Sequence, residues 1–293
     1  MDKLKTRDIA EKIMSALFTL CGFLAIGFVL VITGFLIASG IPAIGQIGLA
    51  DFLFGTKWAS TSAEPSFGIA PFILTSVFGT LGAIAVGVPI GLMCAIYLAK
   101  MSKAKAAAFV GSAVDLLSGI PSVVYGLLGM IIIVPCVRKA FNLPDGASLF
   151  SAIIVLAIMI LPSVISVSET AIRAVPREYE EGSLALGATK TETVFKVVVP
   201  AAKSGILTSV VLGIGRAIGE AMAVMMVAGN VANMPRLFTS VRFLTTAVAS
   251  EMSYSSGLQR QALFSIALVL FIFIMIINMV LNFVVKGGAR VEQ

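Results

Sequence analysis

The run IMSALFTLCGFLAIGFVLVITGFLIA, residues 13–38, contains no Asp, Glu, Lys or Arg and decides the class of fold. A run of about 20 apolar residues is long enough to cross the hydrocarbon core of a bilayer as an α-helix. It follows a basic segment, residues 1–12, as the apolar part of a signal peptide would. That part of a signal peptide has only roughly 7–15 residues, however. We therefore interpret residues 13–38 as a retained first membrane span.

Five further apolar runs follow, and together they predict an all-α fold, a polytopic membrane bundle of six transmembrane helices. The predicted spans are residues 13–38, 69–98, 109–135, 148–170, 204–229 and 261–285. Gly119 and Pro121 interrupt the third, and a membrane helix tolerates such residues when its neighbours satisfy the freed backbone groups. The predicted organisation is a transmembrane domain over residues 13–285, with short tails over residues 1–12 and 286–293.

Composition supports this class and excludes several others. Hydrophobic residues make up 58% of the chain and charged residues only 12%, against about 25% in soluble domains. The absence of histidine excludes His-based acid–base catalysis, and the three scattered cysteines form neither a disulfide framework nor a zinc site. No G-x-x-x-x-G-K-[ST] loop is present. We therefore expect a protein that does not hydrolyse ATP itself and that needs no metal or cofactor.

The distribution of basic residues predicts the orientation. In polytopic membrane proteins Lys and Arg are enriched in cytoplasmic loops. With the N-terminus inside, 14 basic residues fall in inner segments and 6 in outer ones. The inner set is Lys3, Lys5, Arg7, Lys12, Lys100, Lys103, Lys105, Arg173, Arg177, Lys190, Lys196, Lys203, Lys286 and Arg290, and the outer set is Lys57, Arg138, Lys139, Arg236, Arg242 and Arg260. Both termini are therefore predicted to be cytoplasmic.

The inner loop 171–203 is the longest and most charged of the predicted inner loops. Its main part reads PREYEEGSLALGATKTETVFKVVVPAAKSGI, residues 176–206. Pro176 suits a helix start, the glutamates after it suit the first turns, and Gly187 can end that helix. A second amphipathic piece, residues 191–199, precedes Pro200 and the next span. The loop is either an interfacial segment without a partner or a docking element for a soluble partner.

Two opposite charges, Arg216 and Glu220, lie within the fifth predicted span. Arg216 is about 12 residues past Ser204, which places it roughly 18 Å into the bilayer. Charges at this depth are costly and usually face a bundle interior or a water-filled path. Their i, i+4 spacing predicts that both lie on one helix face, beside the G-x-x-x-G of Gly215 and Gly219. The pair is either a structural ion pair or part of an ion path. Asp115, near the start of the third span, is as readily an interface cap as a functional residue.

The inner loop resembles the "EAA" loop of ABC importer permeases, which reads Glu-Ala-Ala, three residues, Gly, nine residues and Ile-x-Leu-Pro. Glu181, Gly182 and Ser183 stand at the Glu-Ala-Ala positions, Gly187 at the glycine and Pro200 at the final proline. Gly182 and Ser183 depart from alanine but remain small. The resemblance implies that this loop binds the ATPase subunit.

Three further stretches resemble the phosphate importer permeases of the PstC type. They are FLFGTKWAS with EPSFGIAPFILTS (52–76), DLLSGIPSVVYGLLG (115–129) and GIGRAIGEAMAVMMVAGN (213–230). With the inner loop, the similarity covers about residues 50–285. One departure is Ala221, where the family usually has threonine, so a hydroxyl is missing beside the two charges.

The resemblance implies a six-span permease that moves inorganic phosphate into the cytoplasm by alternating access, in the bacterial inner membrane. Its implied partners are a second permease of the PstA type, two ATP-binding subunits and an extracytoplasmic phosphate-binding protein. Arg216 and Glu220 would then line the substrate path. Three alternatives stay open from the residues: an ABC permease for another oxyanion such as sulfate or molybdate, an ion-coupled secondary transporter, and a membrane scaffold.

Overall fold

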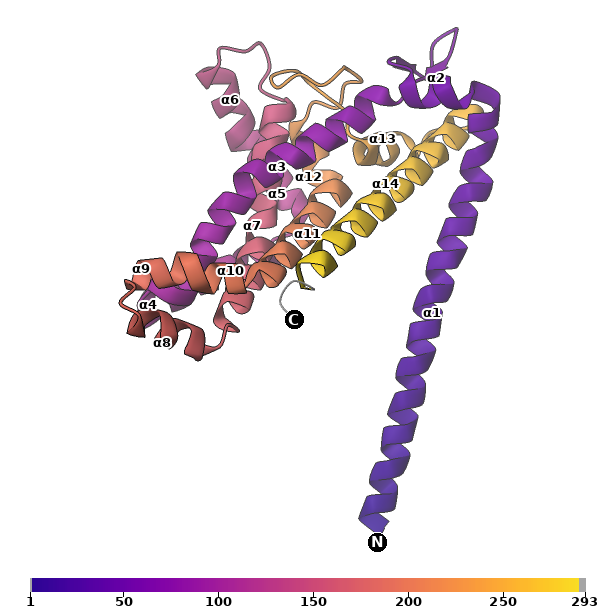
Figure 1. The fold of residues 1–293 in the computed structure, drawn as a ribbon. Helices are drawn as coiled ribbons and strands as arrows, with labels where there is room; N and C mark the ends of the chain where they lie inside the picture. The colour runs from indigo at the N-terminus through magenta and orange to yellow at the C-terminus, as the bar shows by residue number, and fades with distance from the viewer. Residues whose placement is uncertain (1, 290–293) are drawn as a thin grey trace.

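The computed structural model describes residues 2–289, and the side chains of residues 11–281 and 283. The chain is helical almost throughout (Figure 1). Its helices are α1 (Asp2–Ile47), α2 (Leu49–Phe54), α3 (Ala70–Ile96), α4 (Ala104–Gly119), α5 (Ser122–Leu128), α6 (Val134–Ala140), α7 (Leu149–Arg173), α8 (Arg177–Ala185), α9 (Lys190–Thr193), α10 (Val199–Ala201), α11 (Lys203–Gly219), α12 (Met222–Val227), α13 (Leu244–Glu251) and α14 (Gly257–Ala289).

Short elements complete the chain. Turns of π-helix extend α3 (η1, Tyr97–Met101), join α5 to α6 (η2, Gly129–Ile133) and join α9 to α10 (η3, Val194–Val198). A two-stranded antiparallel hairpin pairs β1 (Trp58–Ala59) with β2 (Ser66–Phe67). The Trp58 ring packs edge-on against Phe67, with ring centroids 5.5 Å apart.

The predicted membrane bundle is confirmed, with two corrections to the spans. Within the described residues, five helical segments are long and apolar enough to cross a bilayer: Glu11–Ile47, Ala70–Met101, Ser122–Ala140, Leu149–Arg173 and Gly257–Leu281. A sixth span results if Lys190–Ala201 and Lys203–Gly219, which meet at 69°, are counted as one bent span.

The fifth predicted span was wrong in detail, and the third differs in its bounds. The predicted interruption at Gly119 and Pro121 is confirmed: α4 ends before Ile120, because a residue before proline disfavours the helical conformation, and α5, η2 and α6 follow. Predicted span 204–229 breaks after Gly219 into α11 and α12. The predicted N-terminal tail is helical from Asp2 and continuous with α1, while residue 1 and residues 290–293 of the predicted tails lie outside the described residues.

The core is built around α7, which packs along α3. Glycines let the two helices approach closely: an added Cβ at Gly82 would lie 2.5 Å from Ile153, at Gly87 2.8 Å from Ile160 and at Gly91 2.8 Å from Val164. Membrane helices associate mainly through close packing at small residues, because the lipid is as apolar as the helix surfaces and provides no hydrophobic driving force. In the most apolar part of α7, 61% of the residues are buried.

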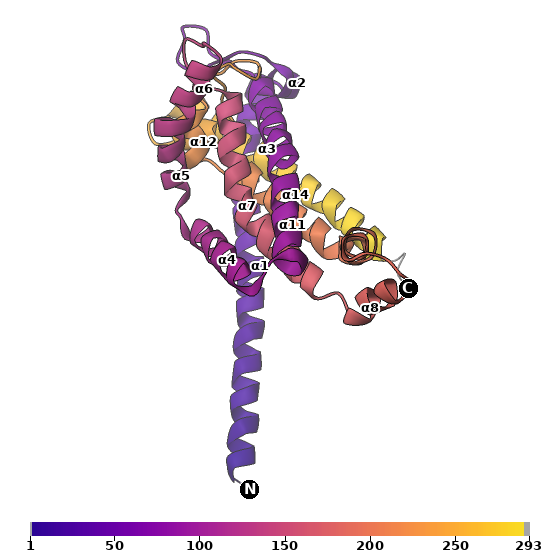
Figure 2. The same ribbon diagram turned by 90° about the vertical axis from the view of Figure 1, so that its left-hand side faces the viewer.

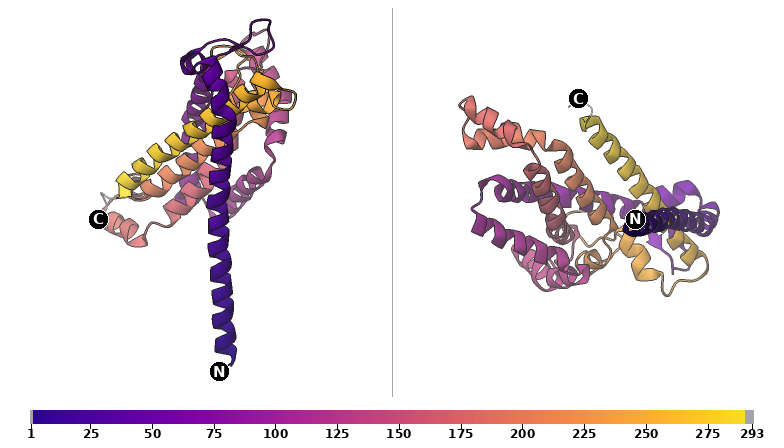
Figure 3. Two further views of the ribbon diagram at one scale, coloured as in Figure 1. Left: turned by 90° about the vertical axis from the view of Figure 1, so that its right-hand side faces the viewer. Right: turned by 90° about the horizontal axis from the view of Figure 1, so that it is seen from below.

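Helix α1 contrasts with α7, because it stands away from the bundle over most of its length (Figures 1 and 3). No residue in its most apolar part is buried. It meets α14 only toward its C-terminal part, where Ser265 Oγ donates to the Gly40 carbonyl at 2.6 Å and Phe35 packs edge-on against Phe264.

The connections gather at two ends of the bundle (Figures 1 and 2). One end holds α2, the hairpin, α6 and α13, and is called the α13 end below. The other holds α8, α9, α10 and the start of α4, and is called the α8 end. The segments predicted to be outer and inner therefore do collect at opposite ends. Which end faces the cytoplasm stays a prediction.

Candidate functional site

The predicted inner loop, residues 171–203, forms the helix, turn and helix that its sequence predicts. Helix α8 follows directly after Pro176 and carries Glu178 and Glu180 in its first turn, where carboxylates favour the exposed N–H groups. None of its residues is buried. Leu186, just after the helix, is 91% exposed and Tyr179 is 54% exposed. The chain therefore presents apolar side chains on this loop without covering them.

Gly187 ends α8 through a Schellman motif. Its N–H donates to the Leu184 carbonyl at 3.0 Å, and the Ala188 N–H donates to the Ser183 carbonyl at 3.3 Å. The motif requires a left-handed backbone, and Gly187 has a φ of +89°. A Cβ added there would meet no atom within 4 Å, so the requirement for glycine is conformational rather than steric.

The other matched positions join α8 to the segment that follows. The Ser183 and Thr193 hydroxyls are 2.9 Å apart, which links α8 to α9. Gly182 has open space around its Cα, with no atom within 4 Å of an added Cβ. Together with Tyr179 and Leu186, Gly182 and Ser183 line an open hollow of about 450 Å³.

Helix α9 begins with a capping box between Thr189 and Glu192. The Thr189 backbone N–H and the Lys196 ammonium hold the Glu192 carboxylate and lower the pKa of Glu192 to about 2. This cap therefore stays charged and formed through the physiological pH range. Pro200 lies in α10, directly before the 69° bend that leads into α11.

A contact that sequence reasoning missed fixes α8 to the bundle. Lys100, in η1, forms an ion pair with Glu180 of α8. Arg173, at the end of α7, donates to the Leu98 carbonyl at 2.8 Å. Glu181 lies nearby, lining with Lys100, Arg173 and Glu180 an open hollow of about 460 Å³. The local sequence carries no signal for this ion pair, because Lys100 and Glu180 are 80 positions apart.

The second candidate region is the break between α11 and α12. Gly219 is the last residue of α11, and Glu220 is extended, with φ −74° and ψ 130°. The predicted i, i+4 helical relation between Arg216 and Glu220 is therefore wrong. Glu220 Oε1 instead accepts the Ala223 N–H at 3.0 Å, and the Glu220 carbonyl accepts the Thr245 hydroxyl at 2.7 Å. These bonds, with the low helix propensity of Gly219, account for the break.

Arg216 lies in the last turn of α11 and is half-buried. A cation is favourable there, because the last carbonyls of a helix carry partial negative charge. Among the described residues, its guanidinium forms no ion pair with Glu220 or any other carboxylate.

The two broken helices contact each other beside their breaks. Helix α5 packs on α12, where an added Cβ at Gly126 would lie 2.7 Å from the Ala223 Cα. Tyr125 spans the first break by donating to the Leu117 carbonyl of α4 at 2.7 Å. Asp115 is exposed on α4, and lines an open hollow of about 700 Å³ at this break. Both interruptions, with Arg216 and Glu220, thus lie in one region of the bundle.

Interrupted membrane helices recur in transporters, where the non-helical backbone lines a cavity or substrate path. The chain belongs to the family described as binding-protein-dependent transport system inner membrane component, whose model matches residues 87–288. It is thus a multi-pass membrane component of a transport system, as the resemblance implied.

Individual relatives narrow the class further. The chain is 35% identical over 283 residues to the probable ABC transporter permease protein YqgH of Bacillus subtilis (strain 168), covering 94% of this chain and 92% of that protein. It is 34% identical to the phosphate transport system permease protein PstC of Pasteurella multocida, covering 76% and 75%. With the PstC of Haemophilus influenzae the identity is 33%, covering 88% and 86%. The predicted resemblance to PstC-type permeases is confirmed.

Solved structures confirm the fold. The chain superimposes on the inward-facing MetNI methionine ABC transporter with a TM-score of 0.56, at 19% identity, over 75% of this chain and 94% of that chain. An amino acid ABC transporter with histidines gives a TM-score of 0.54 at 22% identity, over 75% and 92%. The predicted ABC importer permease fold is therefore correct.

Proposed function

We propose that this chain is the membrane-spanning permease of an ATP-driven importer that carries inorganic phosphate into the cytoplasm by alternating access. The observation that carries this proposal is the similarity, over most of the chain, to relatives named as phosphate transport permeases. The chemistry of the α11–α12 break is consistent with an oxyanion substrate.

The proposed partners are a second permease of the PstA type, two ATP-binding subunits and an extracytoplasmic phosphate-binding protein. The ATP-binding subunit would dock on Glu181, Gly182, Ser183, Gly187 and Pro200. Support comes from the form of this loop, since its apolar side chains are exposed and its turn is fixed. ATP hydrolysis would belong to that partner, and both termini of this chain would be cytoplasmic.

Arg216 is the proposed phosphate contact. A planar guanidinium donates two parallel hydrogen bonds to phosphate oxygens, which lysine cannot reproduce. Because this guanidinium has no carboxylate partner among the described residues, an arriving anion need not displace one. A charge at membrane depth is costly, and a transported anion would offset part of that cost.

Glu220 is the proposed discriminating group. Inorganic phosphate keeps at least one proton at neutral pH, because its last proton dissociates only in strongly alkaline solution. One oxygen of the Glu220 carboxylate is held by the Ala223 N–H, and the other can accept a hydrogen bond from that proton. Sulfate has no proton at this pH and would be repelled. The pair would therefore favour phosphate over sulfate.

The test is uptake of radiolabelled phosphate by assembled transporters carrying Arg216→Lys, Arg216→Gln or Glu220→Gln. Membrane levels and ATPase docking are checked in parallel. We expect at least a tenfold loss in each, with Arg216→Gln no milder than Arg216→Lys. Near-normal uptake in Arg216→Gln would place the arginine outside the path. Competition by sulfate or molybdate against wild-type uptake tests the alternative oxyanions.

A further inference from the structure

The broken end of α11 leaves a carbonyl that a helix would otherwise satisfy. The Glu220 carbonyl instead accepts the Thr245 hydroxyl at 2.7 Å, from a residue at the start of α13 that is only 7% exposed. A buried carbonyl without a partner is costly, so this bond stabilises the extended backbone at Glu220.

The segment from Val241 to Thr245 holds both ends of α12. At the far end of this helix, the Val241 N–H donates to the Ala228 carbonyl at 2.9 Å. Arg242 donates to the Asn230 carbonyl through Nε at 3.0 Å and Nη2 at 2.9 Å. At the near end stands the Thr245 bond to Glu220. Segment 241–245 is thus hydrogen-bonded to the chain on both sides of α12.

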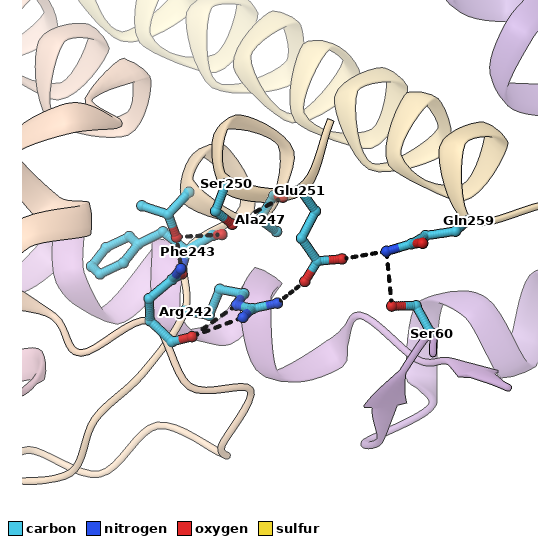
Figure 4. A network of polar contacts seen from close by, with 9 residues as sticks. Ser60, Arg242, Phe243, Ala247, Ser250, Glu251 and Gln259 are labelled. Carbon is cyan, nitrogen blue, oxygen red and sulfur yellow. Dashed lines mark hydrogen bonds and ion pairs between the residues drawn. The ribbon is translucent and has the colours of Figure 1, made fainter. Parts of the chain in front are cut away.

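A polar network then anchors this segment to the rest of the α13 end (Figure 4). Arg242 forms an ion pair with Glu251, and these side chains are 15% and 12% exposed. Glu251 accepts the Gln259 amide at 3.1 Å, and the same amide donates to Ser60 Oγ at 3.1 Å. The network therefore joins α13 to α14 and to the loop that carries the hairpin.

We propose that Thr245 is a positioning residue for transport, which sets the place of the Glu220 carboxylate through its hydrogen bond to the Glu220 carbonyl. The Arg242–Glu251 network holds Thr245 in turn. A movement of the α13 end during transport would then displace Glu220 through segment 241–245. This inference rests on the proposed role of Glu220 in the substrate path.

The experiment is a double-mutant cycle in the complete transporter, with uptake of radiolabelled phosphate as the readout. Thr245→Val keeps the side-chain shape and removes the donor, and Thr245→Ser restores it. Each change is made alone, and Thr245→Val also in the Glu220→Gln background. Thr239→Val is the matched control. Thr239 lies in the connection between α12 and α13, and its hydroxyl donates to the Arg236 carbonyl rather than to Glu220. Membrane level and the concentration of loaded binding protein giving half-maximal uptake are measured for every variant.

We expect Thr245→Val to lower maximal uptake about tenfold at unchanged membrane level and half-maximal concentration, with Thr245→Ser and Thr239→Val near wild type. Thr245→Val should add no further loss to Glu220→Gln, since residues that act as one unit are not additive. If Thr245→Val does not reach the membrane, Thr245→Ala replaces it in the cycle. Independent, multiplying losses would overturn the inference, as would normal uptake in Thr245→Val beside a severe Glu220→Gln. Normal uptake in Glu220→Gln would instead overturn the proposed role of Glu220, and the inference with it.

Discussion

At the α13 end, Arg242 and Glu251 are 15% and 12% exposed, and each is held by further hydrogen bonds. At the α8 end, Lys196 and Glu192 form an ion pair whose side chains are 74% and 47% exposed, although Lys100 and Glu180, which join α8 to the bundle, are only 15% and 28% exposed. Exposed apolar side chains occur at both ends: Phe54 and Tyr254 are 77% and 73% exposed at the α13 end, and Leu186 is 91% exposed at the α8 end.

The difference concerns which end is complete within one chain. At the α13 end the charged groups of Arg242 and Glu251 are bonded within the chain, although Trp58 Nε1 and Asn230 Oδ1 are buried without a hydrogen-bond partner. The α8 loop fixes its backbone with caps but leaves its apolar side chains uncovered, as a surface made for another protein does. The network at the α13 end is thus formed within one chain, whereas the α8 loop is the proposed docking surface for the ATP-binding subunit.

The largest expected effect is the all-or-none labelling of the two ends. In a variant lacking Cys21, Cys94 and Cys136, Asp145→Cys places a thiol at the α13 end and Thr191→Cys one at the α8 end. A membrane-impermeant maleimide applied to intact cells should label the first, and Thr191→Cys should react only after the membrane is opened. Labelling of both from one side would contradict the predicted topology and the assignment of the two ends.

Gly187→Val tests whether the α8 end is a docking surface. A side chain in the left-handed conformation costs about 1–2 kcal/mol, so the valine should shift the turn after α8. ATP hydrolysis by the assembled complex should then lose its response to the loaded binding protein. Gly111→Val is the control, because Gly111 is helical, also has no atom within 4 Å of an added Cβ and lies in α4. Coupling that survives Gly187→Val unchanged would leave the loop as a surface segment.

The two ion pairs should differ sharply in stability. Arg242→Gln leaves the Glu251 charge mostly buried without its cation, which typically costs about 3–5 kcal/mol. Lys196→Gln breaks an exposed pair, for which the usual cost is about 0–1 kcal/mol. Thermal unfolding of the purified protein in detergent measures both. Equal shifts in the two variants would contradict the expected effect of the difference in burial between the two ion pairs.

Sequence alone located the apolar runs and the turn at Gly187, because both depend on neighbouring residues. The sequence did not predict features that depend on contacts between residues far apart in the chain. The run through residues 213–228 reads as one helix, yet Thr245 and the Glu220 side chain stabilise a break within it. Residues 13–38 and 148–170 are similarly apolar, so composition could not tell that α7 would be buried and α1 would stand apart.

The smallest effect is expected at Gly182, the position where the loop departs from the Glu-Ala-Ala pattern. Gly182 lies inside α8, and an added Cβ would meet no atom within 4 Å. Glycine within a helix costs roughly 0.5–1 kcal/mol relative to alanine, so Gly182→Ala should stabilise α8 by about that amount. Hydrogen exchange of the α8 amides should slow by a few-fold in the chain without its partners. If the ATP-binding subunit requires the space beside Gly182, coupling should fall although α8 is more stable. If coupling is unchanged, the alanine positions of the pattern serve helix stability here. Faster exchange in the alanine variant would contradict the open surroundings of Gly182 on which this prediction depends.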